Sequence, residues 1–133
     1  MDEVTALMGV AFNLAHDISE LSLNIEQYPE LHGHSSYGTQ IADAGVSALA
    51  HIACASATFA PDIHSRIEAG HSVSGARDSL HTLEHLVHTL IGNHYLAPER
   101  AQRLFDKIEQ TRAILTALDA ELFGAGLSHR RAS

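Results

Sequence analysis

A chain of 133 residues, 45% of them hydrophobic, has room for one packed core and not for several domains. The absence of Trp and the scarcity of Phe and Tyr, beside abundant Ala and Leu, favour helix over strand. The net charge of −8 is uneven, because residues 1–65 contain acids but no Lys or Arg, and this half should repel nucleic-acid phosphates.

Cys54 is the only cysteine, which excludes an intramolecular disulfide and suits a reducing compartment. The first residues carry no positive charge, and polar residues interrupt the apolar ones that follow, unlike a secretory signal or a membrane span. We therefore expect a cytoplasmic protein with no membrane attachment.

The first predicted helix carries apolar residues in alternating steps of three and four from Val4 to Tyr28, the spacing of a bundle seam. Asp2 is a candidate cap at its start, and Pro29 ends it. A polar loop is expected from there to Ser36.

The second predicted helix, Tyr37–Ala60, is apolar nearly all round, and Asp43 is its only Asp, Glu, Lys or Arg. Such a helix is normally buried on more than one side, whereas each helix of a four-helix bundle ordinarily leaves one face in water. We therefore predict that its outer face forms a subunit interface. The predicted interface residues are Val46, Leu49, Ala50, Ala53 and Ala57.

Pro61 is expected to open the third helix, whose seam continues to Leu90 before a stop at Gly92. Pro98 opens the fourth helix, which ends at Gly124. Short connections predict antiparallel neighbours, hence an all-α, antiparallel, up-down-up-down four-helix bundle over residues 1–124. Residues 125–133 are predicted to form a short, mobile C-terminal tail.

Two stretches, Tyr37–Ser47 (YGTQIADAGVS) and Ala76–Glu84 (ARDSLHTLE), resemble segments of a bacterial family named after intervening sequences in 23S ribosomal RNA genes. The resemblance implies a four-helix bundle that assembles into a homopentameric ring and has no recognised enzymatic activity. Some relatives are nucleic-acid-associated accessory proteins of reverse transcriptases. This chain has Ala42 and Asp43 where the family often has bases, so nucleic-acid binding is not expected of it.

Eleven histidines need a physical account. The densest group is His81, Glu84, His85 and His88, which share one stripe of the third helix away from its core face. Imidazoles one turn apart can chelate Zn(II) or Ni(II), with a carboxylate completing the shell, so this stripe is the candidate metal site. The alternative is a polar face on which neutral histidine replaces charge.

Other titratable groups form less complete patterns. His32 and His34 flank a loop glycine, and a ferritin-like centre would need a second copy of the single Glu68-x-x-His71 motif. The spacing of His51 and Cys54 beside Ser47 invites a nucleophile interpretation. No third orienting residue is evident, so we interpret the pair as a buried cysteine beside a hydrogen-bonded histidine.

The residues and the resemblance together predict a non-enzymatic, homo-oligomeric scaffold or adaptor, a pentamer by resemblance, with an unidentified protein partner. A nucleic-acid accessory role is the first alternative and metal binding through surface histidines the second. No resident cofactor is expected apart from that Zn or Ni. The histidines also predict that an assembly with imidazoles at its interfaces weakens as the pH falls from about 7 to about 5.

Overall fold

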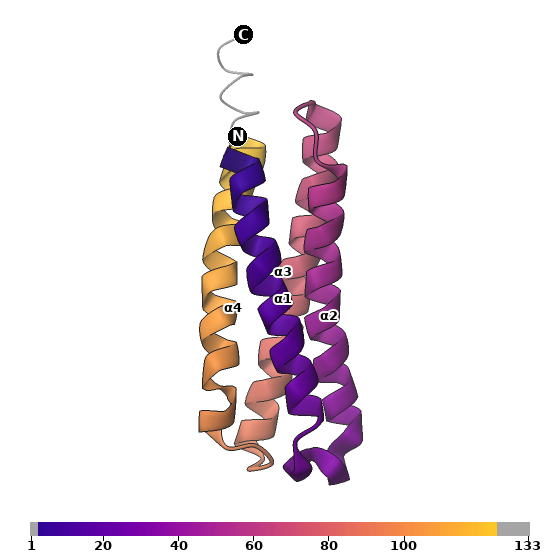
Figure 1. Cartoon of the computed structure of the whole chain (residues 1–133), viewed down its shortest axis with the longest axis vertical. Coiled ribbons are helices and arrows are strands. Elements are labelled where there is room, and N and C mark those ends of the chain that lie inside the picture. Colours follow the sequence, from indigo (N-terminus) through magenta and orange to yellow (C-terminus); the bar gives the residue numbers. More distant parts are fainter. Residues whose placement is uncertain (1–2, 125–133) are drawn as a thin grey trace.

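The computed structural model describes residues 3–124, and these contain helices and turns but no strand. Four long helices follow one another along the chain, with a 3₁₀ turn after the first and a π-helical turn after the last (Figure 1). This confirms the all-α helical bundle. The bounds are α1 Glu3–Glu26, η1 Pro29–His34, α2 Ser35–Thr58, α3 Ile63–Gly92, α4 Pro98–Asp119 and η2 Ala120–Gly124. The predicted cap Asp2 and the predicted tail 125–133 lie outside the described residues.

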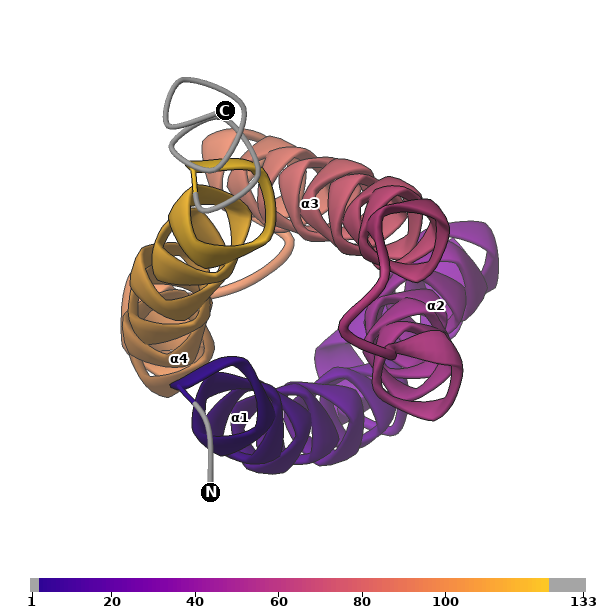
Figure 2. The same ribbon diagram turned by 90° about the horizontal axis from the view of Figure 1, so that it is seen from above.

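The chain reverses direction at every connection. The α1–α2 and α3–α4 connections lie at the lower end of the bundle in Figure 1, and the α2–α3 connection lies at the upper end. Seen from above, the helices stand in the order α1, α2, α3, α4 around the core, and α4 packs against α1 (Figure 2). Helix α2 is therefore diagonal to α4, and the α2–α3 side of the bundle faces away from the α1–α4 side.

The core of α1 follows the predicted spacing at Val4, Ile18 and Ile25, which are buried. Between them, however, Leu7 and Leu21 are only partly buried at the edge of the core. Ala11 of the predicted seam is fully buried, and Met8, Ala15 and Ser22 are buried beside it. Both sets fit steps of three and four, and the small Ala15 and Ser22 face inward where α2 approaches α1 closely.

That close approach depends on Gly45. A Cβ atom at Gly45 would lie 2.6 Å from the Cβ of Ser22 and 3.5 Å from the carbonyl oxygen of Ile18. Ser22 is fully buried, and its hydroxyl donates a 2.8 Å hydrogen bond to that same carbonyl. Only glycine fits at this contact between α1 and α2.

The start of α3 and the segment before α2 differ from the prediction. The N-cap of α3 is Asp62 rather than a residue before Pro61, since its carboxylate accepts a 2.9 Å hydrogen bond from the main-chain N–H of Ser65. This bond holds the pKa of Asp62 below its ordinary value. The expected polar loop before α2 is instead the 3₁₀ turn η1, which forms because Leu31 is buried in the core.

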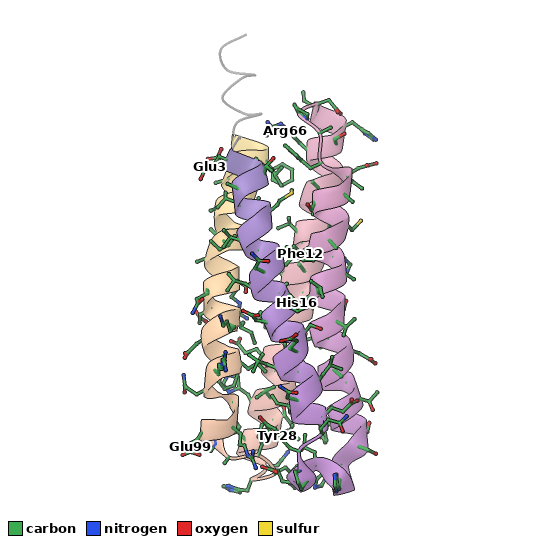
Figure 3. The ribbon with its side chains drawn as sticks, viewed as in Figure 1. Glu3, Phe12, His16, Tyr28, Arg66 and Glu99 are labelled. Atoms are coloured by element: carbon green, nitrogen blue, oxygen red, sulfur yellow. The ribbon has the colours of Figure 1, made fainter. Side chains whose placement is uncertain are left out.

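The upper end of the bundle is closed by contacts between α3 and η2. The ring of Phe123 lies against Gly70, which has no side chain to obstruct it. Arg66, labelled at this end in Figure 3, donates hydrogen bonds to the carbonyl oxygens of Pro61 at 3.0 Å and Glu121 at 3.1 Å. Gly70, which weakens the helical pattern of α3, thus lies under an aromatic ring, and the helix continues through it.

Candidate interaction surface around α2

The outer face of α2 is defined by the five predicted interface residues, and all five reach the surface. The side chain of Val46 is 45% exposed, Ala50 and Ala57 are exposed, and Leu49 and Ala53 are partly buried. They follow one another at helical spacing on one side of α2, away from Gly45 and Ile52 in the core. An apolar stripe without a charged residue therefore runs along α2 from Val46 to Ala57, and the exposed Asp43 lies one turn before it.

Helix α1 extends this apolar surface. Leu23 is 42% exposed and lines a groove of about 540 Å³ together with Glu26, Ala42 and Val46. Phe12, labelled on α1 in Figure 3, is 40% exposed and lies about three helical turns before Leu23 on the same stripe. The outer face of α2 is thus one part of a larger apolar surface shared with α1.

A second groove, of about 580 Å³, lies between α2 and α3, and Asp43 and Ser47 line both grooves. The hydroxyl oxygens of Ser47 and Ser79 lie 2.9 Å apart and join the two walls. Asp43 on α2 and Asp78 on α3 line the groove, and neither forms an ion pair with any described residue. The groove therefore presents carboxylates and hydroxyls, and no Lys or Arg lines it.

His51 lies in this second groove, with its ring over Gly75. A Cβ atom at Gly75 would be 2.7 Å from the Cε1 and Nδ1 atoms of that ring. Within residues 3–124 the imidazole makes no hydrogen bond, and the thiol of Cys54 is exposed. The prediction of a buried cysteine beside a hydrogen-bonded histidine is therefore wrong. Cys54 lies on the solvent side of α2, and the ring of His51 packs on Gly75 instead of forming a hydrogen bond.

The carboxylate of the predicted metal stripe on α3 is already bound by an arginine. Glu84 accepts hydrogen bonds from Arg112 at 2.8 and 3.0 Å, and these hold its pKa below the ordinary value. His81 and His85 are exposed, and His88 stacks on Phe105 with ring centroids 4.6 Å apart. The imidazoles are available as ligands, but a metal would have to take Glu84 from Arg112.

The smaller histidine motifs have other partners. The ring of His34 stacks on Tyr95 at 3.8 Å, which joins η1 to the α3–α4 connection. Glu68 lies 3.1 Å from Nε2 of His64, one turn before it, rather than pairing with His71. Sequence spacing alone does not distinguish these two neighbours of Glu68.

One group that sequence reasoning missed lies on α1. Among residues 3–124, the one set of three His, Cys, Asp or Glu side chains with ligand atoms all within 4.8 Å of one another is His16, Asp17 and Glu20. The group is largely exposed, and Asp17 forms a 3.2 Å ion pair with Lys107. A cation there would compete with that lysine.

The bases of the described chain are mostly neutralised. Four of them pair with acids on another element, at Arg77–Asp119, Arg100–Glu30, Lys107–Asp17 and Arg112–Glu84. Arg66 donates to carbonyl oxygens, whereas the exposed Arg103 contacts no acid among residues 3–124. Paired bases contribute little to the positive potential that nucleic-acid binding needs.

The chain matches no protein-family model, no curated protein and no solved structure. The resemblance to the intervening-sequence family therefore stays a prediction. By length and composition alone, Pro29–Thr58 would also suit a membrane span, because it contains an 18-residue stretch with a mean hydropathy of 1.3. A core helix of a bundle passes the same criterion, and 39% of the apolar stretch concerned is buried inside this one.

Proposed function

We propose that the chain is a non-enzymatic, cytoplasmic scaffold subunit that assembles with copies of itself through the outer face of α2. The resemblance puts the ring at five copies, and the assembled surface is what an unidentified protein partner would bind. The single observation that supports this proposal is the charge-free apolar stripe on α2 from Val46 to Ala57, in which Val46 is 45% exposed beside Leu23 of α1, which is 42% exposed.

The physical reason is the cost of leaving this surface in water. Apolar area removed from water stabilises an interface by roughly 25 cal/mol per Å². Ala50, Ala53 and Ala57 have short side chains, so a second backbone can approach closely and little side-chain entropy is lost. The stripe holds no charge that an interface would have to desolvate.

A non-enzymatic role is favoured by how the reactive side chains are used. The hydroxyl of Ser47 bonds that of Ser79, and Cys54 has no neighbouring base positioned by hydrogen bonds among the described residues. A nucleophile needs such a base within hydrogen-bond reach. The polar groups around α2 are better explained as packing and contact groups than as a catalytic set.

Light scattering coupled to size-exclusion chromatography tests the assembly. Untagged protein at micromolar concentration is expected to elute with a multiple of the 14.3 kDa subunit mass. The double variant Val46→Glu/Ala50→Glu is expected to elute as a folded monomer, because it buries two carboxylates in the interface. The matched control is Ile63→Glu, a more exposed apolar residue on α3, which should leave the mass unchanged.

Cys54 supplies an independent measurement, because its thiol is exposed on the solvent side of α2 in the single subunit. In the assembly, its reaction with a disulfide reagent such as Ellman's should be slowed, and in the Val46→Glu/Ala50→Glu variant it should be fast. A wild-type monomer with a freely reactive thiol would refute the proposal. Recovery of that monomer on floated lipid vesicles would assign the apolar face to a membrane instead.

A further inference from the structure

We propose that assembly is head-to-tail: the carboxylates of Asp43 and Asp78 in the α2–α3 groove bind the guanidinium of Arg103 on α4 of a second copy. This inference rests on the proposed self-assembly and adds which surface meets α2. Within residues 3–124, Asp43, Asp78 and Arg103 are among the charged side chains that form no ion pair.

The acidic side of the contact is the α2–α3 groove. Asp43 and Asp78 come from opposite walls, and neither has an ion pair among the described residues. Ser47 and Ser79 add two hydroxyls to the same groove, which also holds His51 but no Lys or Arg. Carboxylates and hydroxyls on two walls of a groove suit a planar guanidinium, which has five N–H donors.

The basic side is Arg103, which is exposed and has no acid partner among residues 3–124. Its orientation follows from its neighbours on α4. Arg100, one turn before it, pairs with Glu30, and Lys107, one turn after it, pairs with Asp17. Both partners belong to the N-terminal hairpin, so Arg103 lies on the side of α4 that faces α1.

These two sides of the bundle point in opposite directions, because the α1–α4 side is across the core from the α2–α3 groove (Figure 2). A contact between them uses two different surfaces, so each copy has one of each still free. Such a contact repeats, and it closes into a ring when the rotation between copies permits. A pairing of α2 with α2 would stop at a dimer.

Arg103 and Asp43 also lie toward the same end of the bundle. Figure 3 labels Glu99 near the lower end, and Arg103 lies one turn above it on α4. Asp43 lies about two turns above Ser35, where α2 starts at the same end (Figure 1). Copies standing side by side with parallel axes would therefore bring the lower part of α4, with Arg103, beside the lower part of α2, with Asp43, as in a ring whose axis follows the helices.

Charge reversal tests this pairing. Asp43→Arg and Arg103→Asp are each expected to raise the dissociation constant of the assembly at least about tenfold, because each places like charges together. The double variant Asp43→Arg/Arg103→Asp should restore the assembly. Glu109→Gln is the control and should leave the mass unchanged, because Glu109 is 72% exposed and contacts Arg112 on the side of α4 that faces α3. Equal losses in the double and single variants would overturn the pairing.

Cysteine cross-linking tests the geometry without relying on affinity. In a Cys54→Ser background, Asp43→Cys/Arg103→Cys should oxidise to a ladder of covalent oligomers, and either cysteine alone should give none. Dimers of the Asp43→Cys chain alone would show α2 meeting α2 and overturn the head-to-tail inference while leaving self-assembly intact. A wild-type chain that is monomeric by light scattering would instead remove the proposed function, and this inference with it.

Discussion

The guanidinium of Arg112 binds both carboxylate oxygens of Glu84 and so joins α4 to α3 at 2.8 and 3.0 Å. The same guanidinium also contacts Glu109 at 3.3 Å, but that side chain is 72% exposed and belongs to α4 itself. One arginine thus offers a partly buried contact between helices and an exposed contact within one helix, which can be compared directly.

Glu84→Ala is expected to lower the free energy of unfolding by about 1 kcal/mol, because a bidentate, partly buried pair is stronger than an exposed one. Glu109→Ala, the matched control, should change it by less than about 0.5 kcal/mol. Urea denaturation followed by circular dichroism measures both. Equal effects of the two substitutions would show that the bidentate geometry contributes nothing.

The same pair predicts a pH dependence. The hydrogen bonds from Arg112, helped by the nearby His81 and His88, hold the native pKa of Glu84 below its ordinary value of 4.5. The unfolded chain binds this proton more readily, so the stabilisation is complete above about pH 4.5 and is lost as the pH falls through the lowered native pKa. The difference in unfolding free energy between wild type and Glu84→Gln should therefore shrink on acidification. A difference that is constant down to about pH 3 would contradict this.

Gly45→Ala is expected to destabilise the fold by about 1–3 kcal/mol, because the added methyl group overlaps Ser22 in a contact that cannot widen without separating α1 from α2. The control is Gly9→Ala in the exposed part of α1, where a Cβ atom meets nothing within 4 Å. That change should stabilise by about 0.5–1 kcal/mol through helix propensity. Thermal denaturation of both variants should give shifts of opposite sign.

Metal binding at the α3 stripe should depend on Arg112. If His81, His85 and His88 bind Ni(II) with Glu84, Arg112→Gln frees the carboxylate and should strengthen binding about tenfold in calorimetric titrations. Arg77→Gln is the control, since Arg77 pairs with Asp119 between the same two helices and is not part of the stripe. Unchanged nickel affinity in Arg112→Gln would remove Glu84 from the site.

Most of the fold could be predicted because apolar periodicity and helix stops are local signals. Pro98 begins α4 and Gly92 ends α3 where the sequence indicates. The start of α3 could not be placed to the residue, because Pro61 and Asp62 both suit a helix start and the hydrogen bond to Ser65 decides between them. The inner face of α1 was ambiguous for a similar reason, since two sets of positions share one spacing.

The contacts of the candidate surface were harder to predict because they join residues far apart in the chain. In the sequence, Glu84 looks like a metal ligand because its neighbours are His81, His85 and His88. Its partner in the structure, Arg112, lies on the next helix. Cys54 points outward because α2 buries Ile52 and Ala55, and the position of His51 depends on Gly75 of the next helix. The exposure of Val46 was predictable, since one helix cannot turn its whole circumference inward.

All four ion pairs between different elements of the described chain involve α4, whereas α2 is held by small residues packed against α1 and α3. Salt weakens the first kind of contact and hardly affects the second. Rising ionic strength should therefore loosen α4 before the other three helices, and its amides should lose protection from hydrogen exchange first. Helix α4 is also held by the buried Leu104, Ile108, Leu115 and Leu118, so it remains part of the bundle at high salt and is the helix whose attachment responds most to ionic strength.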